Sequence, residues 1–241
     1  MLSLGSLGGG VRFAFTSRVG GESASPFDGL NLSTDVGDDV VIVERNRAAV
    51  LDRLAIDHAV WLHAQHGRVI DRVTGPDGVH EVDGLVTAKS GLALAALSAD
   101  CALVVLADPT TGVVGCLHCG RAGLVSGAVD SMVAAMRDSG ATSIRAAVGP
   151  TICGTCYEVP RELASAVVAV VPAARSDRGA DVEGAALDIR AGVIDQLKRA
   201  GVAVVRLVGG CTLEDPACFS YRRDERTGRM AALVWIGGAS G

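Results

Sequence analysis

Three residues of this chain have side chains that bind metal ions, and each stands beside an apolar segment. His66 precedes a glycine, Cys101 separates two apolar runs, and His118 ends a third. Imidazole nitrogen and thiolate sulfur both bind zinc readily, and three protein ligands leave a fourth tetrahedral position for water or substrate. Together they predict a catalytic metal centre. Taken one at a time, each residue could also be a buried core residue or a turn residue without a metal. The prediction therefore depends on whether the three side chains lie together in the folded protein.

The other cysteines include two pairs with CxxC spacing, Cys116 with Cys119 and Cys153 with Cys156. We do not interpret them as a four-cysteine zinc ribbon, because Cys116 lies inside a strand-like apolar run in which it shares a face with His118. Cys116, Cys153 and Cys156 are interpreted instead as small core residues. Seven cysteines, an odd number, in a chain whose start does not resemble a signal peptide favour free thiols over disulfides.

The amino-acid composition argues against several classes of binding partner. Hydrophobic residues make up 49% of the 241 residues, enough for a large core, whereas aromatic residues make up only 3% and the net charge is -5. Few aromatic residues and no basic run argue against nucleic-acid binding. No apolar stretch reaches the roughly 20 residues of a membrane span. We therefore expect a soluble, cytoplasmic protein that binds small molecules, with neither nucleic acid nor membrane as a partner.

Hydrophobic periodicity predicts which elements position these residues. Strands are predicted at residues 12–16, 59–63, 68–73, 91–97, 102–107, 113–118, 144–148, 202–208 and 230–236, and helices from Asp38 or Asp39 to Leu54 and at 124–136, 161–171 and 188–200. Pro160 is expected to be the first residue of its helix, the glycine-rich first residues are expected to be frayed, and 221–224 is expected to lie in a loop. Because strands and helices alternate irregularly, we predict an α+β fold, a mixed α/β sandwich with strands flanked by helices, as a single domain over 1–241.

Several short stretches, in order along nearly the whole chain, match one known family. They are Phe15-Thr16-Ser17-Arg18-Val19-Gly20-Gly21, Leu30-Asn31-Leu32, Val36-Gly37-Asp38-Asp39, Asn46-Arg47, His66-Gly67, Asp83-Gly84-Leu85-Val86-Thr87, Ala99-Asp100-Cys101, Gly149-Pro150, Tyr157-Glu158-Val159, Phe219-Ser220-Tyr221-Arg222-Arg223-Asp224 and Thr227-Gly228-Arg229. The chain thus resembles the laccase-domain or YfiH-type family. The resemblance implies a compact α and β sandwich and a bacterial cytosolic enzyme, once described as a copper polyphenol oxidase. Family members are now described as zinc-dependent purine nucleoside phosphorylases that also deaminate adenosine and cleave methylthioadenosine.

Carried over by motif, the resemblance makes His66, Cys101 and His118 the ligands of Zn²⁺, with Cu²⁺ as the alternative ion. It implies a nucleoside and inorganic phosphate as substrates. Arginine binds phosphate through paired charge-assisted hydrogen bonds, so Arg18, Arg121, Arg222 and Arg223 are the candidate phosphate ligands.

Three stretches depart from the family pattern. Ala64-Gln65-His66 replaces Gln-Val-His, and Thr151, Cys153 and Gly154 interrupt the usual Gly-Pro-Cys-Ile-Gly-Pro. After the last ligand histidine the family has Ala-Gly-Trp-Arg-Gly, where this chain has Cys119-Gly120-Arg121-Ala122-Gly123. The turn at 119–123, followed by a predicted helix, also offers backbone donors to an anion.

Other functions stay open at this point. One is copper-dependent phenol oxidation, although three ligands are too few for a multi-copper cluster. A second is a role outside nucleoside chemistry, such as editing of peptidoglycan precursors. A third is a thiol hydrolase with Cys101 as nucleophile and His118 as base. Asp100 is either a proton shuttle or, as its place in a turn favours, a structural acceptor of backbone hydrogen bonds.

Overall fold

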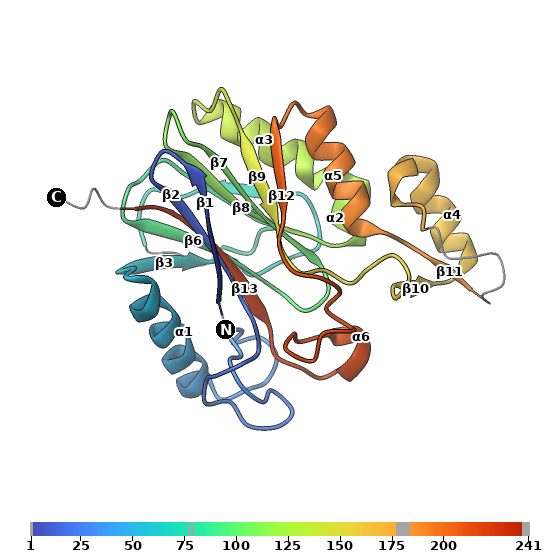
Figure 1. Ribbon diagram of the computed structural model, residues 1–241, viewed down its shortest axis with the longest axis horizontal. Helices are drawn as coiled ribbons and strands as arrows, with labels where there is room; N and C mark the ends of the chain where they lie inside the picture. The colour runs from blue at the N-terminus through green and yellow to red at the C-terminus, as the bar shows by residue number, and fades with distance from the viewer. Residues whose placement is uncertain (1, 77, 79, 177–183, 238–241) are drawn as a thin grey trace.

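The computed structural model describes residues 2–76, 78, 80–176 and 184–237. Two mixed sheets pack face to face in it (Figure 1). The five-stranded sheet runs β1 (Leu2–Gly8), β2 (Val11–Thr16), β13 (Met230–Ile236), β6 (Leu92–Ser98), β3 (His58–Trp61). The six-stranded sheet runs β12 (Val204–Leu207), β9 (Arg145–Val148), β7 (Ala102–Asp108), β8 (Val113–Cys119), β5 (Gly84–Thr87), β4 (Ile70–Arg72), and a separate pair joins β10 (Glu158–Val159) to β11 (Ala185–Ala186).

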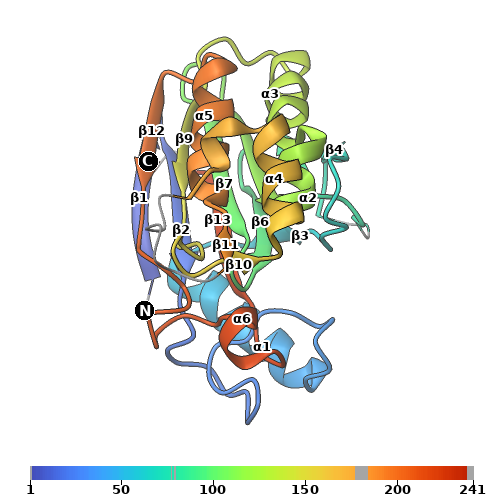
Figure 2. The ribbon, with the colours of Figure 1, turned by 90° about the vertical axis from the view of Figure 1, so that its right-hand side faces the viewer.

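Helices cover the outer faces of both sheets (Figure 2). On the five-stranded sheet lies α1 (Val40–Leu54), and on the six-stranded sheet lie α2 (Arg121–Ser126), α3 (Ala128–Asp138) and α5 (Ile189–Arg199), with α4 (Arg161–Val170) extending that layer. Short helical turns stand at η1 (Pro172–Ala174) and α6 (Tyr221–Asp224). Among the described residues no helix has the length and apolar character needed to cross a lipid bilayer. The predicted α+β sandwich, with strands flanked by helices, is confirmed.

The central strands are buried on both faces. In β7, Leu103 and Val105 point into the core between the sheets, whereas Val104 and Leu106 pack against the helices. Burial on both faces removes the need for alternating polar residues, so these strands appear in the sequence as continuous apolar runs.

The predicted starts of two helices are confirmed, with one correction at a third. Asp39 caps α1 by accepting the amide of Val41, and Asp188 caps α5 by accepting that of Ala191, both at 2.8 Å. Pro160 is not the first residue of α4 but the extended residue before it.

Other differences from the predicted elements have local causes. The first residues are not frayed, because β1 pairs antiparallel with β2 and buries Leu7. The helix predicted at 124–136 is two helices that meet at Gly127, whose φ of 85° ends α2. Residues 221–224 form α6 instead of a loop, with the Ser220 hydroxyl accepting the amide of Arg223. Strand β5 was not predicted, and β3, β4 and β12 are shorter than expected.

Candidate functional site

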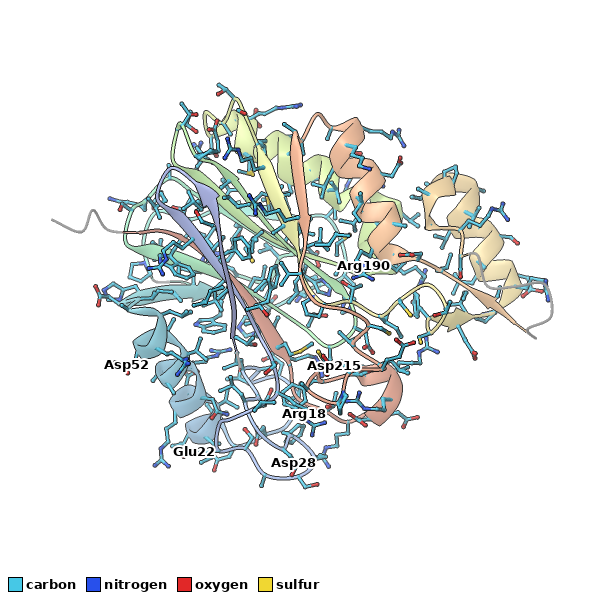
Figure 3. All side chains as sticks on the ribbon, in the orientation of Figure 1. Arg18, Glu22, Asp28, Asp52, Arg190 and Asp215 are labelled. Atoms are coloured by element: carbon cyan, nitrogen blue, oxygen red, sulfur yellow. The ribbon has the colours of Figure 1, made fainter. Side chains whose placement is uncertain are left out.

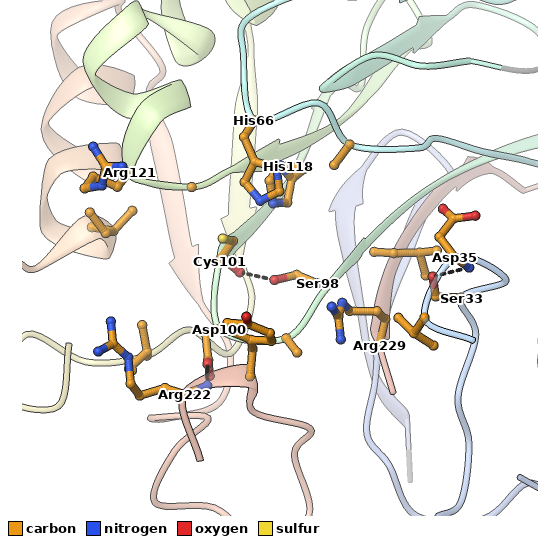
Figure 4. A pocket seen from close by; sticks show the side chains of 18 of the residues that line it. Ser33, Asp35, His66, Ser98, Asp100, Cys101, His118, Arg121, Arg222 and Arg229 are labelled. Atoms are coloured by element: carbon orange, nitrogen blue, oxygen red, sulfur yellow. Dashed lines mark hydrogen bonds between the residues drawn. The ribbon is translucent and has the colours of Figure 1, made fainter. Parts of the chain in front are cut away.

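His66, Cys101 and His118 meet at one end of the two sheets (Figure 4). His66 lies in the loop between β3 and β4, Cys101 just before β7, and His118 near the end of β8. Their ligand atoms, one imidazole nitrogen from each histidine and the Cys101 Sγ, all lie within 4.8 Å of one another. The two imidazole rings stand edge to face with centroids 4.8 Å apart. The structure thus brings together the three residues that the sequence singled out; we call them the donor triad.

The turn that carries Cys101 is held in an unusual backbone conformation. Asp100 has a φ of 95°, which is rare for a residue with a side chain. Its carboxylate accepts hydrogen bonds from the Thr212 hydroxyl at 2.5 Å and from the Arg222 amide at 2.7 Å. Both oxygens are therefore engaged in holding the turn, which is the structural role expected of Asp100, although the donors come from distant loops. The Ser98 hydroxyl adds a hydrogen bond to the Cys101 carbonyl at 2.8 Å.

Asp83 connects the other two members of the triad. Its side chain is fully buried; Oδ1 lies 3.4 Å from Nδ1 of His118, and Oδ2 accepts the amide of Gly67 at 2.8 Å. Its main-chain carbonyl also accepts the amide of His118. A carboxylate behind a histidine ligand fixes the orientation of the ring. The sequence does not by itself assign Asp83 to the site; the available signal is an acidic residue directly before the apolar run of β5.

Electrostatic interactions within the triad favour the ligand form of the thiol. Burial raises the pKa of Cys101, but hydrogen bonds to His118 and His66 and their positive charge outweigh it and lower this pKa to about 6. Burial lowers the pKa of His118, yet the Asp83 and Cys101 hydrogen bonds outweigh it and raise that pKa to about 9. By contrast, burial raises the pKa of Cys116 to about 12. Cys101 therefore loses its proton more readily than Cys116, and the thiolate is the form that binds a cation.

Gly120 has no side chain, and the triad occupies the space that a side chain would fill. A Cβ atom at this position would stand 2.9 Å from the Cys101 Sγ and 3.4 Å from a ring carbon of His66. Its φ of -86° is accessible to any residue, so it is the close approach of the ligands, and not the backbone, that requires glycine here.

The donor set fits a transition-metal ion. Two imidazoles and a thiolate of lowered pKa, with a buried carboxylate behind one ring, are donors that both Zn²⁺ and Cu²⁺ accept.

The triad opens into a cavity of about 460 Å³. Arg121 and Arg222 stand on one side of it and Arg229 on the other (Figure 4). Apolar side chains, namely Leu62, Leu97, Ala99, Ile152, Tyr157 and Ile189, line much of the rest. The Arg222 guanidinium lies over the Tyr157 ring, 5.1 Å from its centroid.

Two of the four predicted phosphate ligands lie elsewhere. Arg223 donates to the carbonyl oxygens of several loop residues, with distances of 2.7 to 3.4 Å, and so holds the 212–218 loop. Arg18 stacks over Phe219 and lies 3.9 Å from Asp28 (Figure 3). Neither lines the cavity. The sequence around Arg18 and Arg223 does not predict these positions, because the partners of both side chains include residues of other loop segments.

Sequence reasoning missed several polar residues of the cavity wall, among them three with ionisable side chains. Burial lowers the pKa of Arg229, which lies in the predicted Thr227-Gly228-Arg229 motif but was not named as a ligand. His63 and Asp35 also line the cavity, with Nδ1 and Oδ2 2.6 Å apart.

All seven cysteines are free thiols, as expected. Cys116 is a core residue, as predicted, and its side chain is buried between the two sheets. Cys153 and Cys156 correct the prediction: they are not core residues but lie half-buried in the loop before β10. Both cysteines stand next to an apolar residue in sequence, Ile152 and Tyr157, so their surroundings in the sequence did not distinguish this loop from a core segment.

Comparison with known proteins gives one consistent result. Residues 12–237 match the family described as multi-copper polyphenol oxidoreductase laccase. A Streptomyces griseus protein named purine nucleoside phosphorylase ORF3 is 46% identical over 236 residues, covering 95% of each chain. A Streptomyces coelicolor purine nucleoside phosphorylase is 47% identical over 234 residues, covering 94% of this chain and 96% of the relative.

Solved structures agree with the sequence matches. The Bacillus licheniformis protein YfiH superposes with a TM-score of 0.86 at 31% identity, covering 94% of this chain and 92% of that one. YlmD of Geobacillus stearothermophilus gives a TM-score of 0.84, also at 31% identity, covering 95% of this chain and 93% of that one. The chain therefore belongs to the laccase-domain family, the family of YfiH.

Proposed function

We propose that this protein is a purine nucleoside phosphorylase, which converts adenosine, inosine or methylthioadenosine and inorganic phosphate into the free base and the pentose 1-phosphate. The observation that carries the proposal is the donor triad opening into a cavity that also presents three arginines. The names of the Streptomyces relatives support it. A cavity of about 460 Å³ lies within the usual size range of small-molecule sites.

The arginines supply the phosphate site. Arg121 and Arg222 stand on the same side of the cavity, where their guanidinium groups can bind a dianion with paired hydrogen bonds (Figure 4). Stacking of Arg222 on Tyr157 orients its guanidinium group. Arg121 also begins α2, one residue after Gly120. In the proposed site Arg121, which lines the cavity, replaces the arginine that the family has one position later in the chain.

The reaction needs a phosphate oxygen at C1′ of the sugar. As that oxygen bonds to C1′, the bond from C1′ to the base nitrogen breaks, its electron pair leaves with the purine, and the purine takes up a proton. The apolar wall around Ile152 and Ile189 offers no hydrogen-bond partner to water, which competes with phosphate for C1′. His63, held through Nδ1 by Asp35, stands in the cavity wall as the group that donates this proton.

The donor triad is the proposed site of Zn²⁺. When bound, such an ion supplies Lewis acidity that stabilises negative charge developing on a substrate oxygen or nitrogen. Asp83 orients the His118 ring for ligation, and Gly120 leaves room for the thiolate. Deamination of adenosine, in which water replaces the amino group at C6 and ammonia leaves, is proposed as a side activity of the same site.

A product assay tests this proposal. The zinc-loaded protein is incubated with adenosine, inosine and methylthioadenosine, with and without phosphate, and the products are separated. We expect free base and sugar phosphate that depend on added phosphate, loss of both in Cys101→Ala, and full activity in the core control Cys116→Ala. Unchanged product in Cys101→Ala contradicts the proposal.

Two further assays of the purified protein test phenol oxidation and thiol hydrolysis, the alternative enzyme functions. Phenol-dependent oxygen uptake by the copper-loaded protein would favour oxidation. Turnover that thiol alkylation abolishes and chelators leave intact would favour a Cys101 nucleophile.

A further inference from the structure

A second group of metal-binding side chains lies apart from the donor triad. Cys153 and Cys156 come from the loop before β10, and Cys211 and Glu214 from the loop after β12. The three Sγ atoms and a carboxylate oxygen of Glu214 all lie within 4.8 Å of one another. We call these four residues the loop cluster.

The contacts within the loop cluster converge on one point. The Cys156 Sγ lies 3.2 Å from Oε1 of Glu214, and the Cys153 Sγ lies 4.0 Å from the same oxygen. The Cys153 amide donates to the Cys211 sulfur at 3.3 Å. The Thr155 hydroxyl, between the two CxxC cysteines, lies 3.0 Å from the Cys153 Sγ. Sulfur atoms from two loops thus face one another, with hydrogen-bond donors around them.

Four groups of this kind repel one another when all of them lose their protons. Burial raises the pKa of Cys156, and the Glu214 carboxylate and the neighbouring thiols raise it further. Burial acts in the same direction on Cys153, but hydrogen bonds from Thr155, Cys211 and Cys156 outweigh it and lower the pKa of that thiol. The Cys156 thiol donates a hydrogen bond to Oε1 of Glu214, so the fourth group of the cluster already faces the sulfur atoms.

We propose that the loop cluster is a second metal site, which binds Zn²⁺ through the thiolates of Cys153, Cys156 and Cys211 and the carboxylate of Glu214. Zinc takes four ligands from thiolates, imidazoles and carboxylates in closed structural sites, and CxxC in a turn is a usual source of two of them. Binding displaces the thiol protons to solvent, so affinity increases with pH. The proposal does not depend on the chemistry of the donor triad.

The loops that the ion would join form part of the cavity wall. Ile152 and Tyr157 flank the CxxC turn and line the cavity. Thr212, between Cys211 and Glu214 in sequence, holds Asp100 beside the Cys101 ligand. Closure of the loop cluster around an ion therefore stabilises both the wall that carries Tyr157 and the turn that carries Cys101.

Metal stoichiometry tests the second site separately from the first. The full-length protein is stripped with a chelator under reducing conditions, dialysed against Zn²⁺, and its zinc content is measured by elemental analysis. We expect two equivalents for the wild type, one for Cys153→Ser/Cys156→Ser, one for His66→Ala/Cys101→Ala, and two for the control Cys116→Ala. One equivalent in the wild type that Cys153→Ser/Cys156→Ser retains would overturn the proposal.

Cobalt(II) titration provides an independent readout. Three of the four sulfur ligands of the two sites belong to the loop cluster, so Cys153→Ser/Cys156→Ser is expected to remove most of the sulfur-to-cobalt charge-transfer absorption. Glu214→Gln, at an exposed position that should not disturb folding, is expected to weaken binding of the second equivalent only. Without reductant, five free thiols in the denatured wild type and five also in Cys153→Ser/Cys156→Ser would show a disulfide between these two cysteines and also overturn the proposal.

Discussion

The carboxylate of Asp83 and the imidazole of His118 face each other inside the protein, with Oδ1 and Nδ1 3.4 Å apart and the Asp83 side chain fully buried. The other oxygen of Asp83 holds the amide of Gly67, the residue after His66. One carboxylate therefore orders two ligands that are separated by 52 positions in sequence, the difference between 66 and 118.

Removal of this charge is expected to weaken metal binding without unfolding the site. Asp83→Asn keeps the shape of the side chain but loses the negative charge behind His118, and loss of such a partner typically costs about 10- to 100-fold in metal affinity. Competition with a chromophoric chelator measures the affinity. The matched control is Asp71→Asn, which breaks a histidine contact of 3.0 Å, to His80, outside both metal sites. Equal affinities of Asp83→Asn and wild type would contradict the assigned role.

A single methyl group at Gly120 is expected to displace the ligands. The Cβ of Gly120→Ala would stand 2.9 Å from the Cys101 Sγ, so either the thiol or α2 must shift. We expect at least about tenfold weaker zinc binding at the triad, since ligand distances tolerate only a few tenths of an ångström. Gly75→Ala adds a methyl group where no atom lies within 4 Å, and it should bind zinc like the wild type.

The arginines are expected to separate into two classes. Arg121→Ala and Arg222→Ala should each raise the KM for phosphate and lower kcat/KM about 10- to 100-fold, because each removes a charge-assisted hydrogen bond of roughly 1.5–3 kcal/mol. Arg223→Ala should instead lower the melting temperature, because four loop carbonyls lose their donor. Arg199→Ala, on the exposed face of α5, should change neither. A phosphate KM that responds only to Arg223→Ala would reverse the assignment.

Asp108 is expected to contribute to acid sensitivity. Burial raises its pKa, but backbone amides of Ser143, Thr142, Thr110 and Thr111 outweigh this and hold the pKa well below its usual value. A carboxyl whose pKa is lowered by folding stabilises the protein above its unfolded pKa of about 3.9, and this stability is lost as the pH falls further.

Asp108→Asn should therefore cost roughly 1–3 kcal/mol of unfolding free energy near neutral pH, because amides that point at the buried Asp108 carboxylate lose an acceptor. The difference from wild type should shrink as the pH falls below about 4. Urea denaturation at a series of pH values measures it. Asp52→Asn, at the exposed surface of α1 (Figure 3), should stay within about 0.5 kcal/mol of wild type at every pH. A constant Asp108→Asn difference from pH 7 to pH 3 would show that the charge is not involved.

The sequence alone predicted the central strands, the starts of two helices and the three residues of the donor triad. β7 and β8 could be predicted because strands buried on both faces consist of uninterrupted apolar residues. The starts of α1 and α5 could be predicted because Asp39 and Asp188 act on amides two or three residues away. The triad could be named because few residue types bind a transition metal, and because the three stand beside apolar segments where the family resemblance places its metal ligands.

Only the tertiary structure decided which polar groups serve the site. Asp83, Arg229 and His63 reach it through contacts between segments far apart in sequence, and Arg223 is drawn away from it by carbonyls of another loop. The pairing of β1 with β2 likewise outweighs its glycine-rich composition. Local sequence patterns reflect interactions between residues a few positions apart. The contacts at the site join segments that are distant in sequence, and the packing of the two sheets and their helices decides which of these segments meet.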